Sequence, residues 1–338
     1  MAAGFGPIGT LNRSFDPFSG SPRTASVASN CTSDQESTMP SETHAHTVPA
    51  DAPIVVAVDG SAISQQAVAW AAVDAALHRC RLEIVTSFAI PFGFGPSATV
   101  TQDNLDQLCG DAERVLDEAT RVARAAAPDV ALAISTEPID EPIIPALLTR
   151  SKQARMLVVG GRGLGAVRRV LLGSVSAAVA RHAHCPVTVV HTVSATDAIS
   201  ACKPVLVGVD GTPNSEPAIE LAFDEASRRK VSLIALHAWS DTSGLALPEI
   251  SWPGVANAED TLFAESLADW TDRYPDVSVR RVLVCDNAVH SLLEESNNAQ
   301  LVVVGSHGRG GFAGMLLGST STALLHSVQC PISIVRGE

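Results

Sequence analysis

From about residue 51 onward, short apolar runs alternate with longer amphipathic or alanine-rich stretches. The β-branched run Ile54–Val58 predicts a buried strand. The alanine-rich stretch from Ser64 to Arg79 predicts a helix, and the apolar run Leu82–Phe88 predicts a second strand. Strands that alternate with helices in this way indicate a parallel sheet covered by helices on both faces.

The same rhythm continues to a fifth strand. We predict helices over 103–127 and 143–153, strands over 131–136 and 156–159, then a glycine-rich connection, a further helix and a last strand over 187–190. A doubly wound sheet with the strand order 3-2-1-4-5 would bring the first and fourth strands together. The sequence therefore predicts an α/β fold of the Rossmann-like kind.

The whole pattern occurs twice, which predicts two tandem domains. "PIVVAVDGSAISQQA" from Pro53 matches "PVLVGVDGTPNSEPA" from Pro204, so Asp59 corresponds to Asp210, 151 residues later. We predict a disordered tail over 1–50, rich in Ser, Thr, Pro, Gly and Ala. A first domain over 51–191, a linker over 192–203 and a second domain over 204–338 complete the predicted organisation.

Composition narrows the class of protein. A net charge of −13 argues against nucleic-acid binding, which rests on basic side chains that meet phosphates. The sequence contains no apolar stretch of membrane-spanning length, and its first residues lack the pattern of a secretory signal, so we expect a cytoplasmic protein without a membrane partner. The seven cysteines include no Cys-x-x-Cys pair, and we predict no protein-held metal site.

A glycine motif follows the fourth strand of each copy, with identical spacing. The motif is Gly, two residues, Gly, nine residues, Gly, Ser: Gly160, Gly163, Gly173 and Ser174 in the first copy, and Gly305, Gly308, Gly318 and Ser319 in the second. Glycine permits a positive φ and a close backbone approach, and a helix N-terminus offers unpaired N–H groups to an anion. The motif therefore predicts a phosphate cradle, with Ser174 and Ser319 as helix N-caps or hydroxyl donors.

Two better-known phosphate motifs do not fit. The sequence contains no Gly-Lys-Ser/Thr, which excludes a Walker A loop. "GRGGFA" roughly matches the dinucleotide fingerprint, but it follows the fourth strand and lacks the acidic residue about 20 positions later.

An aspartate ends the first strand of each copy. Asp59 and Asp210 are followed by Gly-Ser and Gly-Thr, and they would face the same crevice as the glycines. A carboxylate there can accept hydrogen bonds from a sugar hydroxyl or a base amine. The alternative is an Asx turn or helix cap, and the two roles can coexist.

On these residues the chain resembles the universal stress protein (UspA-like) family, as a tandem member of the ATP-binding type. The marks are Val-Asp-Gly-Ser/Thr, G-x₂-G-x₉-G-S and a closing Cys-Pro-Val/Ile strand, in both halves. The resemblance implies two domains of the adenine nucleotide alpha hydrolase-like fold, each binding ATP. It places Asp59 and Asp210 near the adenosine and the motif glycines and serines around the phosphates. It adds Ser176 and Ser321 as further phosphate-contacting hydroxyls, and adenine near Phe88 and Ala89 or near His237 and Ala238.

The predicted function is that of a nucleotide-dependent regulator of stress response or growth, with ATP, with or without Mg²⁺, and no or slow hydrolysis. Two alternatives stay open: a weak ATPase, and a partner-binding scaffold whose glycines serve packing alone. We expect the two copies to pair through their last strands, 187–190 and 332–335, and two chains to form a homodimer. The sequence does not identify a regulatory protein partner.

Overall fold

The computed structural model describes residues 51–89, 101–161, 172–191, 199–239, 253–308 and 316–337, which belong to one compact unit. The predicted tail, the loop over 91–100 and the motif glycine Gly163 lie outside the described residues.

The first repeat alternates strands and helices as predicted. Its elements are β1 (Ile54–Ala57), α1 (Ala62–His78), β2 (Leu82–Ser87), α2 (Gln102–Ala126), β3 (Ile134–Ile139), α3 (Ile143–Arg150), β4 (Met156–Gly160), α4 (Ser174–His182) and β5 (Val187–Val190). The predicted third strand was three residues too early. β3 is mostly exposed, so its pairing with β2, which sets Ile134 opposite Leu82, fixes its position rather than an apolar pattern.

The second repeat has the same order of strands and α-helices. Its elements are β6 (Val205–Val209), α5 (Glu216–Arg229), β7 (Leu233–Ala238), α6 (Pro253–Arg273), β8 (Val279–Val284), α7 (Ala288–Ser296), β9 (Leu301–Gly305), α8 (Ser319–Ser327) and β10 (Ile332–Val335). Short 3₁₀ turns at Ser200–Cys202 and Pro213–Ser215 precede β6 and α5.

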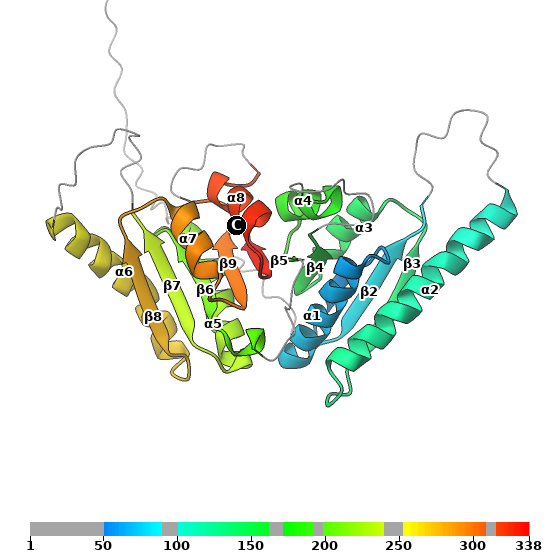
Figure 1. The fold of residues 1–338 in the computed structure, drawn as a ribbon, viewed down its shortest axis with the longest axis horizontal. Helices are drawn as coiled ribbons and strands as arrows, with labels where there is room; N and C mark the ends of the chain where they lie inside the picture. Colours follow the sequence, from blue (N-terminus) through cyan, green and yellow to red (C-terminus); the bar gives the residue numbers. More distant parts are fainter. Residues whose placement is uncertain are drawn as a thin grey trace, which may run out of the picture. The chain divides into compact units, whose positions relative to one another are not determined.

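The strands form one ten-stranded sheet in the order β3-β2-β1-β4-β5-β10-β9-β6-β7-β8 (Figure 1). Neighbouring strands are parallel within each repeat, which confirms the predicted order 3-2-1-4-5 in both. β5 and β10 pair antiparallel, with Ile332 opposite Val189, and this confirms the predicted contact between the last strands. The Thr188 and Ser333 hydroxyls, both buried, hydrogen-bond across this pair at 2.6 Å.

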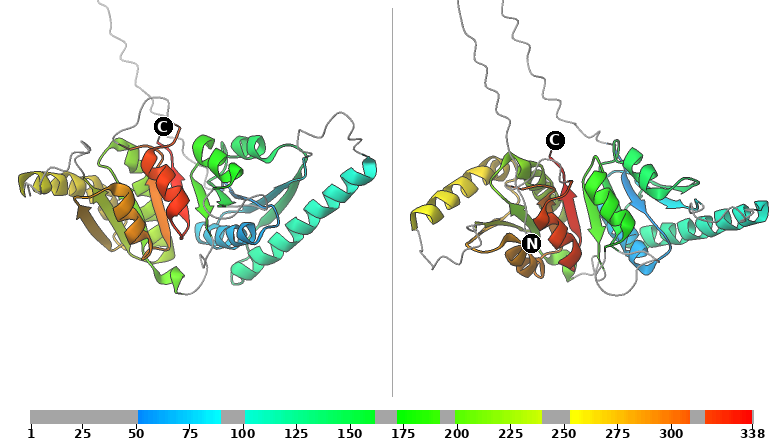
Figure 2. Two further views of the ribbon diagram at one scale, coloured as in Figure 1. Left: turned by 45° about the horizontal axis from the view of Figure 1, so that its top comes forward. Right: turned by 90° about the horizontal axis from the view of Figure 1, so that it is seen from above.

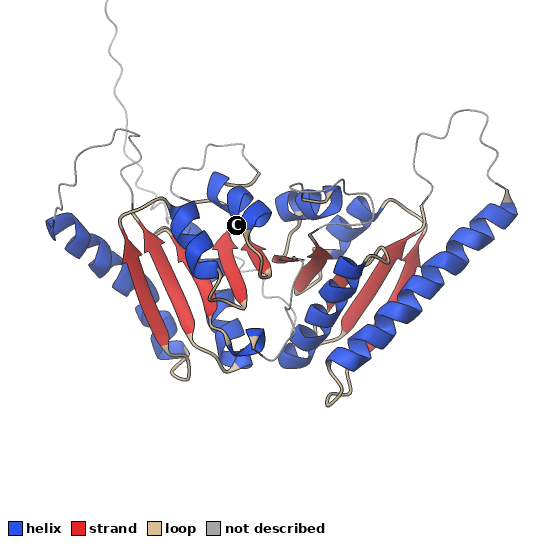
Figure 3. Cartoon of the chain, in the orientation of Figure 1, coloured by secondary structure: helices blue, strands red, loops and turns tan. Residues whose placement is uncertain are grey.

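Helices cover both faces of the sheet (Figures 2 and 3). One apolar cluster joins the strands to α1, α2, α5 and α6, and it contains the fully buried side chains of Trp70, Phe223 and Phe263. The other joins the opposite faces of the strands to α3, α4, α7 and α8, around Leu147 and Leu324. None of the helices within the described ranges is long and apolar enough to cross a membrane.

Candidate functional site

The sheet topology brings the two predicted motifs of each repeat to the same edge. β1 lies beside β4 with Ala57 opposite Val159, and β6 lies beside β9 with Val207 opposite Val303. Because the strands are parallel, the residues after β1 and β4 leave the sheet side by side, and so do those after β6 and β9. This edge, at the carboxyl ends of the central strands, is where ligands bind in doubly wound sheets.

The aspartates after β1 and β6 form tight turns into the next helix. The Asp59 carboxylate accepts a hydrogen bond from the Ser61 N–H at 3.0 Å. Asp210 Oδ1 accepts from the Thr212 N–H at 2.8 Å and from its hydroxyl at 2.7 Å. Both aspartates therefore form the Asx turn that the sequence offered as the alternative to a ligand role. It engages Oδ1 of each carboxylate, and it is compatible with a ligand role.

In these turns the glycine after each aspartate adopts the left-handed backbone conformation. Gly60 has φ +80° and Gly211 has φ +73°. Residues that have a side chain rarely adopt this region, so the Asp-Gly pairs specify these turns.

In the first repeat, two hydrogen bonds join the beginning of the glycine motif to its end. The Gly173 N–H donates to the Gly161 carbonyl at 2.8 Å, which brings the start of α4 back to the end of β4. The buried Ser176 hydroxyl donates to the Gly160 carbonyl at 2.7 Å. These two bonds therefore fix the start of α4 beside the end of β4.

The second repeat is closed in the same way. The Gly318 N–H donates to the Ser306 carbonyl at 2.7 Å, and the buried Ser321 hydroxyl donates to the Gly305 carbonyl at 2.6 Å. Identical bonds at equivalent positions show that the repeated spacing encodes one repeated geometry. Ser176 and Ser321 lie in the first turns of α4 and α8, as predicted, and their hydroxyls hold the strand ends.

The predicted helix caps were wrong. The N-cap residues of α4 and α8 are Gly173 and Gly318, with φ −61° and −65°, and neither helix has a side-chain cap bond. Ser174 and Ser319 are the first helical residues and are exposed. The carbonyls of Gly173 and Gly318 already accept the first helical hydrogen bonds; in α4 this bond comes from the Ala177 N–H. The two serines therefore lie one position after the N-cap, and their hydroxyls do not cap the helices.

These motif positions need glycine because other atoms lie close to the backbone there, and not because the backbone has a positive φ. A Cβ at Gly318 would lie 3.2 Å from the Ser306 carbonyl oxygen, and one at Gly305 would lie 3.2 Å from the carbonyl oxygen of Asn214. A Cβ at Gly308 would lie 3.2 Å from Asp210 Oδ2. The second motif glycine therefore lies directly against the carboxylate that ends β6.

In the first repeat the strand end approaches the helix that follows Asp59. A Cβ at Gly160 would lie 3.0 Å from Ile63 Cγ2 and 3.3 Å from the Ser64 backbone nitrogen. Gly163, the equivalent of Gly308, is outside the described residues.

The end of β7 carries a pair that the sequence did not reveal. His237 is buried, and its ring nitrogens contact the Val209 carbonyl oxygen at 2.7 Å and Glu259 Oε2 at 3.0 Å. Its ring also lies 5.5 Å from the Phe263 ring, centroid to centroid. Glu259 comes from α6, 22 residues later, and no spacing or motif marks it in the sequence.

The arrangement is suited to an anionic ligand with hydrogen-bonding groups. The first turns of α4 and α8 present N–H groups without intrahelical acceptors, and the helix dipole adds partial positive charge there. Asp59 and Asp210 supply acceptors for hydroxyl or amine groups beside those helix ends.

Comparisons with known proteins show the family to which the chain belongs. The sequence model of the universal stress protein family matches residues 52–191 and 202–336. Universal stress protein Rv1996 of Mycobacterium tuberculosis is 44% identical over 300 residues, which cover 84% of this chain and 94% of that protein.

Solved structures extend the likeness to the fold. A universal stress protein from Archaeoglobus fulgidus has a TM-score of 0.63 at 20% identity, over 85% of this chain and 97% of its own. A universal stress protein solved in complex with cAMP is 34% identical over 42% of this chain and 98% of its own, with a TM-score of 0.33. With the family match in both repeats and a relative of 44% identity along most of the chain, the protein belongs to the universal stress protein family.

Proposed function

We propose that the chain binds ATP at one site in each repeat and acts in the cytoplasm as a nucleotide-dependent regulator of stress response or growth. In this proposal the phosphates lie at the N-termini of α4 and α8, within the glycine motifs. Asp59 and Asp210 accept hydrogen bonds from the adenosine, and the ends of β2 and β7 contact the adenine.

One observation carries the proposal: the two glycine motifs are closed at their ends by the same hydrogen bonds. Gly173 and Gly318 are the N-cap residues of α4 and α8, and a helix N-terminus offers backbone N–H groups and partial positive charge to an anion. A Cβ would intrude at Gly308 beside the Asp210 carboxylate. A cradle that a single methyl group would narrow fits a phosphate-bearing ligand held by backbone groups.

Ser176 and Ser321 take a positioning role in this proposal. Their hydroxyl hydrogens are engaged by the carbonyls of Gly160 and Gly305. They therefore hold the strand ends against the helix starts, while the exposed Ser174 and Ser319 are the hydroxyls open to a phosphate.

Hydrolysis is not required by this account. Mg²⁺ would arrive with the phosphates of ATP, and the Asp210 carboxylate lies close to Gly308 of the second motif. A weak ATPase remains the second candidate, and phosphate release that is lost in Asp59→Ala and Asp210→Ala would favour it.

The test is binding stoichiometry. Purified full-length protein is denatured and the released nucleotide is identified by chromatography, and the nucleotide-free chain is then titrated by calorimetry with ATP, ADP, GTP and cAMP. We expect two ATP per chain. Gly308→Val removes the second-repeat site and lowers the stoichiometry to one, because the side chain enters the space beside Asp210.

The matched control is Gly110→Val on α2, where a Cβ meets nothing within 4 Å. This variant keeps two sites. A chain that carries no nucleotide and gives no heat with any of the four ligands would favour the scaffold alternative. Retention of both sites in a Gly163→Val, Gly308→Val double variant would refute the cradle.

Homodimer formation stays a prediction. The last strands, one candidate surface for association, pair with each other inside the chain. The edges of the ten-stranded sheet are β3 and β8. We propose that two chains associate through a surface other than the β5–β10 pair. Light scattering tests this, and a dimer would have a mass near twice 35.1 kDa.

A further inference from the structure

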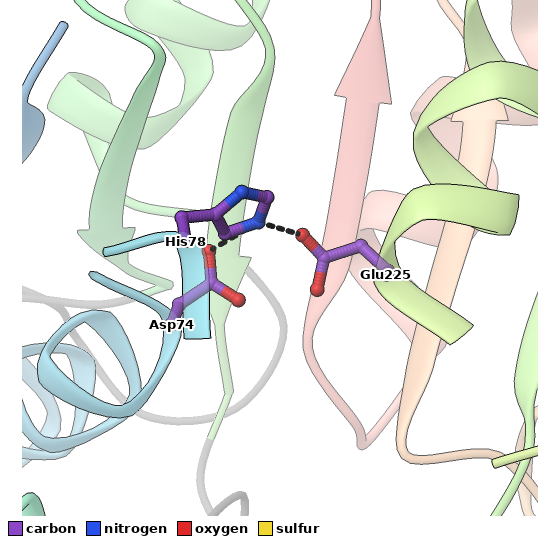
Figure 4. A group of neighbouring side chains, drawn as sticks. All are labelled: Asp74, His78 and Glu225. Carbon is purple, nitrogen blue, oxygen red and sulfur yellow. Dashed lines mark hydrogen bonds and ion pairs between the residues drawn. The ribbon is translucent and has the colours of Figure 1, made fainter. Parts of the chain in front are cut away.

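A buried charged cluster joins the two repeats, far from the glycine motifs in sequence. Asp74 and His78 come from α1, and Glu225 and Arg229 come from α5 (Figure 4 shows the first three). The side chains of Asp74 and Glu225 are fully buried, that of His78 is 1% exposed and that of Arg229 7%. A buried side chain stays charged only when it is paired with an opposite charge or hydrogen-bonded.

The four residues are repeat equivalents. Asp74 and Glu225 are 151 residues apart, as are His78 and Arg229, which is the spacing between Asp59 and Asp210. Each repeat thus contributes an acid and, four residues later on the same helix, a base. The base is a permanently charged arginine in the second repeat and a titratable histidine in the first.

Arg229 bridges the two acids. Its Nε lies 2.7 Å from Glu225 Oε2, and its Nη2 contacts Asp74 Oδ1. The guanidinium also lies 5.1 Å from the centre of the Trp70 ring. One positive charge therefore meets two buried carboxylates, and one negative charge is left to balance.

His78 is placed to supply the second positive charge. Its Nε2 lies 2.8 Å from Glu225 Oε1 and 3.8 Å from Asp74 Oδ2, and its Nδ1 lies 3.6 Å from Asp224 Oδ2. Nε2 hydrogen-bonds Glu225, whereas Nδ1 has no hydrogen-bond partner among the described residues and lies near the charge of Asp224, which favours a proton there. Asp224 is itself paired with Arg228 at 2.9 Å, at the edge of the cluster.

We propose that His78 is an imidazolium in the folded chain, and that the proton it carries locks α1 of the first repeat to α5 of the second, so that the junction between the repeats is a pH-sensitive latch. With His78 charged, the four buried groups sum to zero. Loss of the proton leaves an unbalanced carboxylate charge in a site closed to water.

The pKa directions agree with the geometry. Burial alone lowers the pKa of His78, but the hydrogen bond to Glu225 and the charges of Asp74, Glu225 and Asp224 outweigh it and raise the pKa above 6.5. Burial and the neighbouring Glu225 also raise the pKa of Asp74 above 3.8, while the charges of Arg229 and His78 oppose the rise. Both shifts mean that the folded cluster binds more protons near neutral pH than the unfolded chain does.

The sign of the effect follows from this difference. A group whose pKa is raised on folding stabilises the folded state below its unfolded pKa, and that stability is lost as the pH rises through the folded pKa. For His78 the loss begins near pH 6.5. One extra bound proton changes the folded-to-unfolded ratio by up to about tenfold per pH unit.

A metal ion is the competing occupant, because ligand atoms of Asp74, His78 and Glu225 lie within 4.8 Å of one another. However, the 2.8 Å between His78 Nε2 and Glu225 Oε1 is a hydrogen-bond separation. Two ligands of a tetrahedral zinc ion stand about 3.3 Å apart, given bonds of about 2.0 Å. Arg229 moreover places a positive charge on both carboxylates, which favours a proton over a divalent cation.

The test is a histidine titration of the full chain. NMR spectra of protein labelled with ¹³C at the histidine ring are recorded from pH 5 to 9, and the His78 signal is assigned with His78→Gln. We expect a titration midpoint for His78 above 6.5, lowered by at least one pH unit in Glu225→Gln. His290 is the internal control, because it pairs with Asp286 at 2.8 Å but is 61% exposed.

Equilibrium unfolding across the same pH range gives a second readout. The folded-to-unfolded ratio of the unmodified chain falls between pH 6.5 and the His78 midpoint, by up to about tenfold per unit. Glu225→Gln flattens this fall, and His290→Gln keeps it.

Three results would overturn the proposal. They are a His78 midpoint at or below 6.5, an unchanged pH slope in Glu225→Gln, and stoichiometric zinc in protein purified without chelator. The third is measured on the unmodified chain alone, so it stands even if a variant fails to fold.

Discussion

Replacing Arg229 by leucine tests how the two repeats are held together. The substitution leaves a shorter, apolar side chain and removes the charge that meets both Asp74 and Glu225. It also removes the stacking on Trp70 and a hydrogen bond to Gln300 Oε1 at 3.3 Å. Two carboxylates then share a site with no exposure to water and His78 as the one remaining base.

The size of the loss follows from the buried ion pairs that the substitution breaks. Removing one partner of a buried ion pair costs about 3–5 kcal/mol. The charge of Arg229 holds down the pKa values of both Asp74 and Glu225, so both rise when it is removed. Protonating a carboxyl removes the uncompensated charge, and this costs about 1.4 kcal/mol less for each unit by which the pH falls. We therefore expect a loss of about 4 kcal/mol in the free energy of unfolding at pH 7 and a smaller loss at pH 5.

The assay is urea unfolding at pH 7 and pH 5, followed by tryptophan fluorescence. Arg228→Leu is the matched control, because Arg228 neighbours Arg229 on α5 but pairs with Asp224 where the two side chains are 36% and 22% exposed. We expect the control to lose at most about 1 kcal/mol, with little change between the two pH values. Equal losses in the two variants, or an Arg229→Leu loss that does not shrink at pH 5, would refute the reasoning.

Two further predictions concern single residues outside this cluster. Gly110→Ala should raise the free energy of unfolding by about 1 kcal/mol in the same assay, because Gly110 lies inside α2 and its added Cβ meets nothing within 4 Å; a destabilised variant would contradict the open environment. Ser321→Ala should lower it by about 1–3 kcal/mol, because the buried hydroxyl no longer reaches the Gly305 carbonyl. The exposed Ser319→Ala should change it by less than about 0.5 kcal/mol, and equal effects at the two serines would contradict the observed bond.

The sequence predicted the sheet well because its central strands are buried on both faces. β1, β4 and β5 are continuous β-branched or apolar runs, and their predicted limits differ from the observed ones by at most one residue. β3 was misplaced because it is an edge strand whose residues are mostly exposed and include Pro138. Its position depends on pairing with β2, which no local pattern encodes.

The candidate site was predictable in its spacing but not in its local chemistry. The number of residues between Gly305 and Gly318 is the same as the number between their counterparts in the first repeat. Such equal spacing is improbable without a common geometry, and it singled out the glycines. The assignment of caps failed because serine is the commoner N-cap, and only the hydrogen bond from the Thr322 N–H to the Gly318 carbonyl shows that the glycine is the N-cap.

The charged cluster between the repeats carried a signal that was not used. An acid followed four residues later by a base occurs at equivalent positions of both copies, at Asp74 with His78 and at Glu225 with Arg229. Alone, each pair resembles an ordinary salt bridge on a helix surface. Their burial follows from the antiparallel pairing of β5 with β10, a contact between residues about 145 positions apart.

The most direct test of the account is the number of ATP molecules that one chain binds. Calorimetric titration of the nucleotide-free, full-length protein should give two sites, with one lost in Gly308→Val and none lost in Gly110→Val. Absence of ATP binding, or two intact sites in Gly308→Val, would contradict the claim that the paired glycine motifs are phosphate cradles.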